Sequence, residues 1–266
     1  MLIGLLFVPK EKKNMLLDEL TYYREKEDYK GEIHFSALPK KFKGKFEAKA
    51  RVARAWMEAY ENVLHEMAYF SALAVYRGSL AFEHHRFSKE FHEYNRFTAM
   101  VLKAGIAWHL VPKNYDFVTI TFFPDAKERS TWPEVGCKDN FEEYILYRAE
   151  LDSYLSRCAG KVYPRVFIQN IKLVDSAKED LIQLTDLLLG TVQSALVAGS
   201  RQETKITLGE MLLKWQKDLE NPPLKQNYKL HRKLNIWAFP DENGQPFIPK
   251  DFALEKILNE NQISLF

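Results

Sequence analysis

VDSAKEDLIQLTDLLLG, residues 174–190, contains the strongest local structural signals in the chain. It follows an alternating apolar stretch that favours a β-strand over 166–174. Ser176 and Glu179 then have the spacing of a capping box, in which two side chains satisfy backbone amides at a helix start. A leucine-rich run comes next, so we expect a helix over 181–197 that is apolar on nearly every side.

Gln183 and Asp186 are two polar residues that stand among leucines in this apolar helix. They lie three positions apart and therefore share one helix face. A buried carboxylate without a partner is strongly unfavourable, so Asp186, which we expect to be mostly buried, needs a cation. The cation is either a metal ion or a Lys or Arg of a neighbouring element, and the residues alone leave both open.

Patterns of strand and helix alternate along the rest of the chain. Strands are expected over 2–8, 32–36, 70–76, 117–123, 166–174 and 234–239, and helices over 10–26, 46–67, 87–109, 140–158 and 208–219. Gly160 is the expected cap of the fourth helix. This order predicts one α/β domain over 1–266, with a mixed central sheet flanked by helices. Its central strands should include 2–8, 70–76 and 117–123, and 200–266 should form a C-terminal helical and strand extension.

Composition favours a soluble, folded protein. Hydrophobic residues make up 46% and aromatic residues 14% of the chain, and the net charge is only +2. A nucleic-acid site would therefore need locally clustered charge. Gln183, Asp186 and Gln193 interrupt the longest apolar run, so we expect no membrane span. The apolar start is too short for a secretory signal, and two cysteines without metal-type spacing predict a reducing, cytoplasmic location.

Basic residues cluster directly after the expected strand over 32–36. They are Lys40, Lys41, Lys43, Lys45, Lys49, Arg51 and Arg54, with Glu47 as the one acid among them. We expect this segment to face solvent. Next to acidic residues, such a cluster would follow a phosphate backbone. A solvated loop and helix face explains the same charges, and both interpretations stand.

Several segments resemble the family catalogued as domain of unknown function 3800. QLTDLLLG at 183–190 is similar to its Q-x-x-D-L-L-x-G signature, and Asp175-Ser176 to the D-S pair that precedes it. GEIHFS at 31–36 resembles a hallmark strand of the family that is followed by basic residues. LLFVPKE at 5–11, FPD at 123–125 and LNIW at 234–237 are similar to its V-P turn, its strand ending in an acid and its closing strand.

This resemblance implies a variant of the RNase H fold and a metal-dependent nuclease. In such sites carboxylates hold Mg²⁺ or Mn²⁺, which activates water and stabilises the leaving oxygen. The catalytic candidates carried over are Glu32, Asp125, Asp175 and Asp186, with Glu32, Asp175 and Asp186 as metal ligands. Supporting roles fall to Gln183, Ser176 and His34. His34 is either a general base, a phosphate contact or an ordinary hydrogen-bonded histidine.

The chain departs from the family pattern at its start, because no D-E-S strand precedes residues 2–8. A misassigned start codon, a trimmed chain and a lost site each explain this. We therefore expect the isolated chain to be weak or silent as a nuclease. The alternative is a non-catalytic relative that binds nucleic acid or a partner within a complex. The edge of the 2–8 strand should be covered by 234–239, by another chain or by a second copy.

Overall fold

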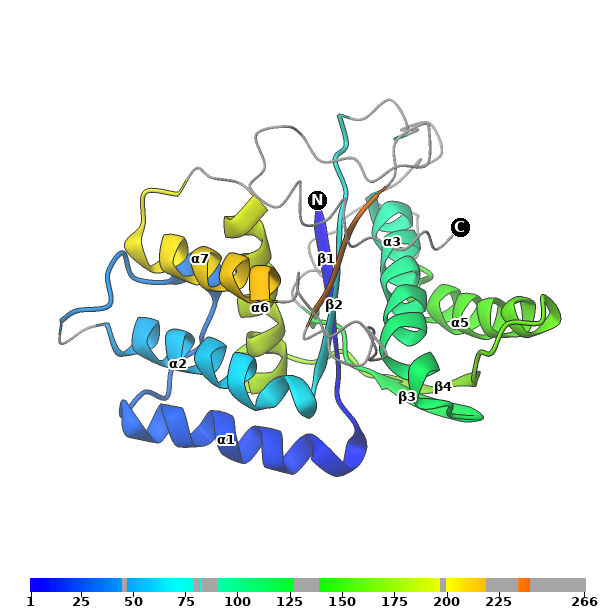
Figure 1. Ribbon diagram of the computed structural model, residues 1–266, viewed down its shortest axis with the longest axis horizontal. Helices are drawn as coiled ribbons and strands as arrows, with labels where there is room; N and C mark the ends of the chain where they lie inside the picture. Colours follow the sequence, from blue (N-terminus) through cyan, green and yellow to red (C-terminus); the bar gives the residue numbers. More distant parts are fainter. Residues whose placement is uncertain are drawn as a thin grey trace. The chain divides into compact units, whose positions relative to one another are not determined.

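The computed structural model describes residues 1–44, 47–78, 82, 90–126, 139–196, 200–218 and 234–239. The chain forms two compact units (Figure 1). The first unit comprises Met1–Phe82 and Ala177–Phe266, and the second comprises Glu83–Ser176. Each unit contains both helices and strands, so the predicted α/β class is confirmed.

The first unit is built on a sheet of the strands β1 (Leu2–Phe7), β2 (Tyr69–Ala74) and β5 (Leu234–Ala238), in the order β1-β2-β5 (Figure 1). β1 runs antiparallel to β2 and β5 runs parallel to it, so the sheet is mixed, as predicted. Ser71 and Asn235 are register partners, and the Asn235 Nδ2 donates to the Ser71 Oγ at 2.8 Å. This bond satisfies two polar side chains that are buried within the sheet.

The predicted placement of the strands is wrong in two respects. β1 lies at an edge of its sheet within the described part of the chain, and the strand over 117–123 belongs to a different sheet. The expected covering of the β1 edge by 234–239 is also wrong, because β5 pairs with the other side of β2. An apolar run reports burial but does not report which strands are neighbours. Covering of this edge by a second chain stays a prediction.

Helices pack on one side of this sheet. They are α1 (Lys13–Lys26), α2 (Ala48–Asn62), α6 (Asp180–Leu196) and α7 (Glu203–Asp218), which confirms the predicted helices of this unit (Figure 1). Short 3-10 turns lie at Lys10–Lys12, Phe35–Ala37, Leu64–Glu66, Val111–Lys113 and Ser176–Lys178, and a π-helical turn lies at Ile106–Leu110.

α7 and β5, which fall in the expected 200–266 extension, both contribute side chains to the core of the first unit.

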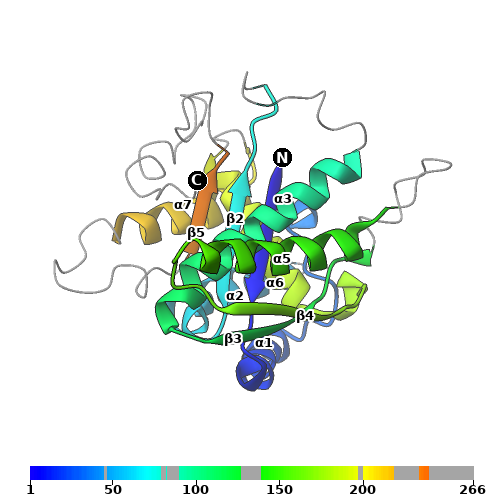
Figure 2. The same cartoon turned by 90° about the vertical axis from the view of Figure 1, so that its right-hand side faces the viewer.

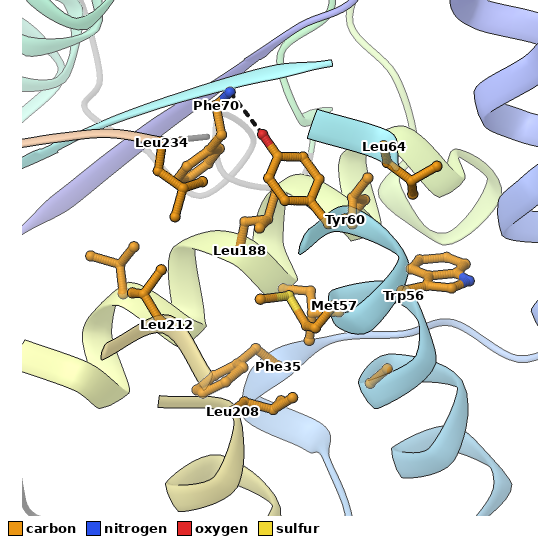
Figure 3. Packing of buried hydrophobic residues seen from close by; sticks show 14 of the residues in the cluster. Phe35, Trp56, Met57, Tyr60, Leu64, Phe70, Leu188, Leu208, Leu212 and Leu234 are labelled. Atoms are coloured by element: carbon orange, nitrogen blue, oxygen red, sulfur yellow. Dashed lines mark hydrogen bonds between the residues drawn. The ribbon is translucent and has the colours of Figure 1, made fainter. Parts of the chain in front are cut away.

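Two aromatic residues of α2 place polar atoms inside this core and satisfy them there. The indole of Trp56 donates to the Leu20 carbonyl at 3.0 Å. The Tyr60 hydroxyl donates to the Ala68 carbonyl at 3.0 Å and accepts the Phe70 amide at 3.2 Å (Figure 3). Burial raises the pKa of Tyr60, so its hydroxyl remains a donor. These bonds connect α2 with α1 and with the start of β2.

The second unit contains the parallel strands β3 (Phe117–Phe122) and β4 (Arg165–Ile171) and the helices α3 (Glu90–Gly105) and α5 (Phe141–Cys158). α5 lies along one face of this two-stranded sheet (Figure 2). Alternate residues of β4 are buried under it and the others are exposed. One face of the sheet is therefore covered, and the other is open to solvent.

The end of α5 is a Schellman turn. Gly160 has a positive φ of 72°, which an L-residue with a side chain rarely adopts. Its amide donates to the Arg157 carbonyl, and the Lys161 amide donates to the Ser156 carbonyl, both at 3.0 Å. This geometry confirms Gly160 as the predicted C-cap.

Residues 32–36 do not form the predicted strand. His34 is extended, with φ −128° and ψ 127°, but Phe35–Ala37 is a 3-10 turn. Ile33 and Phe35 are buried whereas His34 is exposed, so the alternation behind the strand prediction is present. The amides of Ile33 and Phe35 donate to side chains of α6 instead of to another strand. The pattern marks an extended segment packed on a helix, and the strand prediction is wrong.

Gly190 of α6 provides the space in which this segment packs. A Cβ atom built at position 190 would collide with the ring of Phe35. Both residues are buried, and Phe35 belongs to the core cluster (Figure 3). The glycine at this helix position is therefore explained by the close approach of an aromatic ring.

We expect Gly190→Ala to lower the free energy of unfolding by about 1–3 kcal/mol, because it forces the Phe35 ring to move. Denaturant unfolding measures this change. In a Phe35→Ala background the same substitution should be neutral, or stabilising by up to about 1 kcal/mol through helix propensity. Equal destabilisation in both backgrounds would show that the ring does not exclude the side chain.

Candidate functional site

One face of α6 holds the extended segment through its backbone. Gln183 Oε1 accepts the Ile33 amide at 2.8 Å, and Asp186 Oδ2 accepts the Phe35 amide at 2.8 Å. Alternate residues of an extended chain point the same way, so these two amides face the helix together. The Q-x-x-D spacing thus places two acceptors on one helix face, where they satisfy backbone donors that are removed from water.

Arg24 of α1 reinforces this attachment. Its Nη2 donates to Gln183 Oε1 at 2.6 Å and to Asp180 Oδ1 at 2.7 Å, and its Nη1 donates to the Gly31 carbonyl at 2.7 Å. Its guanidinium carbon lies 4.9 Å from the ring centroid of Trp56. Only 12% of the Arg24 side chain is exposed. The planar guanidinium suits this role because it directs several donors in fixed directions while it stacks on an aromatic ring.

His34 and Asp186 form a hydrogen-bonded pair on the solvent side of the segment. The His34 Nδ1 lies 2.7 Å from Asp186 Oδ2, and the two side chains are 50% and 36% exposed. The Asp186 side chain is therefore mostly buried, as predicted, although its carboxylate reaches outward to His34. A carboxylate only accepts, so Nδ1 carries the donated proton, and in the neutral form of the ring the lone pair is at Nε2. Nε2 has no hydrogen-bond partner among the residues that the structure describes.

Lys49 of α2 brings a positive charge near two of the predicted carboxylates. Burial lowers the pKa of Lys49, and the negative charges of Glu32 and Asp186 act in the opposite direction. The sequence left open whether a metal ion or a basic side chain offsets the charge of Asp186. Lys49 is such a basic side chain. Lys205 of α7 adds a second charge next to the segment, because its Nζ donates to the Ser36 carbonyl at 3.2 Å.

The basic cluster that follows the segment divides into two groups. Exposed side chains are found at Lys40, Lys41, Lys43 and Arg54, and partly buried ones at Lys49 and Arg51. Lys45 lies outside the described residues. Arg51 pairs with Glu27 at 2.6 Å and Arg54 pairs with Glu58 at 2.7 Å. The arginines are therefore neutralised locally. The prediction of a solvent-facing cluster is confirmed for Lys40, Lys41, Lys43 and Arg54, whereas Lys49 and Arg51 are partly buried.

Asp125 and Asp175 belong to the second unit, where they follow β3 and β4. Asp125 and Val174 form a parallel bridge, in which the Ala126 amide donates to the Val174 carbonyl at 2.8 Å. Asp125 therefore lies beside the residue that precedes Asp175. The structure thus places these two acids at the carboxyl ends of neighbouring parallel strands. Glu32 and Asp186 lie in the first unit, where the charge of each carboxylate raises the pKa of Lys49.

The predicted magnesium or manganese site stays a prediction. Within the described ranges, no group of three or more His, Cys, Asp or Glu side chains is arranged to hold a metal ion. Ser176, expected to support such a site, is buried and begins the 3-10 turn that leads into α6. α6 itself begins at Asp180, and the Glu179 carbonyl accepts the amides of Ile182 and Gln183, so the helix starts later than the spacing of Ser176 and Glu179 predicted.

Comparisons of the chain with protein-family models, with curated proteins and with solved structures find no match. The resemblance to domain of unknown function 3800 therefore remains a prediction based on the quoted motifs. In the part of the chain that the structure describes, no helix is both long enough and apolar enough to span a membrane.

Sequence reasoning missed Arg24, Asp180 and Lys205. Asp180 lies three positions before Gln183, so one further polar residue on that helix face was visible in the sequence. Arg24 and Asp180 are separated by 156 positions, and no local pattern connects them. Only the packing of α1 beside α6 shows that Arg24 binds both Asp180 and Gln183.

We expect Gln183→Leu to lower the free energy of unfolding by about 1–3 kcal/mol, because it leaves the buried Ile33 amide without its acceptor. Gln193→Leu is the matched control, since Gln193 is exposed on the same helix. That variant should unfold within about 0.5 kcal/mol of the wild type. Equal denaturation midpoints for both variants would show that Gln183 does not hold the segment.

Proposed function

We propose that this protein hydrolyses phosphodiester bonds of nucleic acids, with His34 as the general base. The observation that carries the proposal is the 2.7 Å hydrogen bond between His34 Nδ1 and Asp186 Oδ2, with the ring half exposed. A carboxylate in this position fixes the tautomer of the imidazole and stabilises the imidazolium that forms during proton transfer. The Phe35 amide, bound to the same oxygen, holds the carboxylate in place.

Local positive charge supports a phosphodiester as the substrate. Lys40, Lys41 and Lys43 are exposed directly after the segment that carries His34. The Thr204 amide donates to the Lys40 carbonyl at 3.4 Å, which fastens this basic loop to the start of the helix that carries Lys205. A phosphate chain bound along these lysines would pass close to the segment. The resemblance to a nuclease family points to the same substrate class.

The proposed reaction transfers a proton to His34 while one P–O bond forms and another breaks. Nε2 of His34 accepts a proton from water as the water oxygen attacks phosphorus. The new P–O bond forms, the bond to the leaving oxygen breaks, and that oxygen takes up a proton from the imidazolium or from solvent. Asp186 stays ionised and offsets the positive charge of the ring. The lysines stabilise the negative charge that develops on the phosphate oxygens.

The carboxylates of the first unit fit proton transfer better than they fit a metal cage. Asp186 Oδ2 already accepts from the Phe35 amide and from His34. Glu32 and Asp186 both act on the ammonium of Lys49, which would compete with a divalent ion. The proposed step therefore uses His34, Asp186 and the lysines. Cleavage measured with EDTA, Mg²⁺ or Mn²⁺ tests the alternative metal site at Glu32, Asp175 and Asp186.

A second candidate is a non-catalytic nucleic-acid-binding relative. The observation that favours it is the matching role of Gln183 and Asp186, which both accept a backbone amide of the extended segment. In that case Asp186 is an anchor of the fold, and His34 only adds a hydrogen bond to it. The basic loop would then bind phosphate without hydrolysis.

We further propose a reducing, cytoplasmic location. Cys158 is a free and exposed thiol, and Cys137 lies outside the described residues. Exposed free thiols are typical of compartments in which disulfides do not persist.

We expect slow cleavage of single-stranded RNA or DNA that falls by about 10²–10⁴-fold in His34→Ala. Asp186→Asn should also lower cleavage, because one amide oxygen can still accept from both the Phe35 amide and Nδ1, but the neutral side chain no longer offsets the positive charge of the ring. Labelled oligonucleotides, separated by size after incubation with EDTA, Mg²⁺ or Mn²⁺, provide the measurement. Lys10→Gln, an exposed lysine at the start of the chain, is the control.

Three outcomes would contradict this assignment. Cleavage that is unchanged in His34→Ala would remove the histidine from the mechanism. Cleavage that requires Mg²⁺ or Mn²⁺ and is lost in Glu32→Gln and Asp175→Asn would favour the carboxylate metal site. Binding without cleavage under every condition would favour the non-catalytic relative.

A further inference from the structure

A basic groove lies in the second unit and shares no residue with the proposed site around His34. It has a volume of about 650 Å³ and lies at the start of β3 and β4. The residues that give it its chemistry are Tyr115, Asp116, Phe117, Arg157, Lys161 and Arg165. Three of them are cations and one is an acid, so the groove is strongly positive in a chain of net charge +2.

The cations of the groove are available to a ligand. Arg157, Lys161 and Arg165 are exposed, and none of the three forms an ion pair with any residue that the structure describes. The Schellman turn at Gly160 holds Arg157 and Lys161 close together at the end of α5. Arg165 is fixed at the start of β4, where its amide donates to the Asp116 carbonyl at 2.9 Å. The backbone thus fixes the positions from which all three charged side chains extend.

The open face of the β3–β4 sheet continues from this groove and carries two aromatic rings. Phe117 is 56% exposed and Phe167 is 45% exposed. In the parallel register Phe117 pairs with Arg165, and Thr119 pairs with Phe167. The two rings therefore occupy diagonal positions on one face, next to a cation and a threonine. Each ring thus leaves a flat apolar surface open to a ligand that can stack on it.

We propose that this surface binds a single strand of nucleic acid. Its phosphates contact Arg157, Lys161 and Arg165, and two unpaired bases stack on Phe117 and Phe167. Aromatic residues on an open sheet beside a basic groove recognise single strands, because every unpaired base offers a flat face and every nucleotide a negative charge. Bases in a duplex are already stacked on each other and leave these rings uncovered.

Charge and polarity favour this occupant over a protein. The rings do not form a continuous apolar patch, since Thr119 and Arg165 lie between them in the register. The proposal does not depend on hydrolysis at His34. A protein that binds single strands here and cleaves nothing would retain this site and lose the proposed function.

Fluorescence anisotropy with labelled oligo-dT and oligo-U of about 12 nucleotides tests the proposal, with a duplex of the same length and polyglutamate as competitors. The full chain carrying His34→Ala is used in EDTA, so that cleavage does not affect the reading. The two oligonucleotides tell whether DNA or RNA binds more tightly. Phe117→Ala with Phe167→Ala should weaken binding by about 5- to 150-fold per stacked base.

The charge variant Arg157→Gln, Lys161→Gln, Arg165→Gln should weaken binding and reduce the slope of log K against log salt by about 2 units, at about 0.7 per phosphate contact. Two controls are matched to these variants. Lys10→Gln, Lys26→Gln, Lys30→Gln removes the same charge from exposed positions of the first unit. Tyr147→Ala with Tyr154→Ala removes two rings of α5 that are 61% and 62% exposed. Both controls should bind as the unsubstituted chain does, and thermal melts confirm that each variant folds.

Three results would overturn the proposal. The first is equal loss of affinity in the groove variants and in their controls, which would indicate non-specific charge. The second is a duplex or polyglutamate that binds as tightly as the single strands. The third is wild-type affinity in the variant that lacks Phe117 and Phe167.

Discussion

Two backbone amides, those of Ile33 and Phe35, determine how the site is built. Both belong to buried residues, and a buried amide without an acceptor is strongly unfavourable. A neighbouring strand would ordinarily supply the acceptors, but here Gln183 and Asp186 of one helix do so. Because His34 lies between the two anchored residues, its backbone is held on both sides. The exposed histidine is thereby positioned by contacts that are themselves protected from water.

Asp186 connects the stability of the first unit with its proposed chemistry. One oxygen accepts a backbone amide, which is a structural bond, and also the His34 ring, which is the bond that a general base needs. Arg24 completes the arrangement from the other side, because it binds Gln183 and Asp180 and stacks on Trp56. A change in this group therefore affects folding and chemistry together, and only substitutions that keep the acceptor separate the two effects.

Local secondary structure could be predicted from the sequence more reliably than the contacts between residues that lie far apart in the chain. Helical periodicity located α6, and Asp186 in an apolar helix signalled that a partner was needed. The alternation around Ile33 was real, but it is the same for a strand in a sheet and for an extended segment on a helix, so the strand prediction failed. The strand at 2–8 was likewise visible, but not its place at a sheet edge, where only Ile3 is fully buried within the described part of the chain. Arg24 was out of reach because its partner lies 156 positions away.

The distribution of basic residues along the sequence likewise does not show which of their charges remain unpaired in the fold. The cluster between 40 and 54 is conspicuous in the sequence, yet Arg51 and Arg54 are neutralised by acids of the first unit. Arg157, Lys161 and Arg165 attract less notice, because each stands alone among neutral residues. A helix cap and a strand start bring these three to one groove, where no described acid pairs with them. In a chain of nearly neutral net charge, the attraction of a polyanion depends on the cations that the fold leaves unpaired, and a count of basic residues does not identify them.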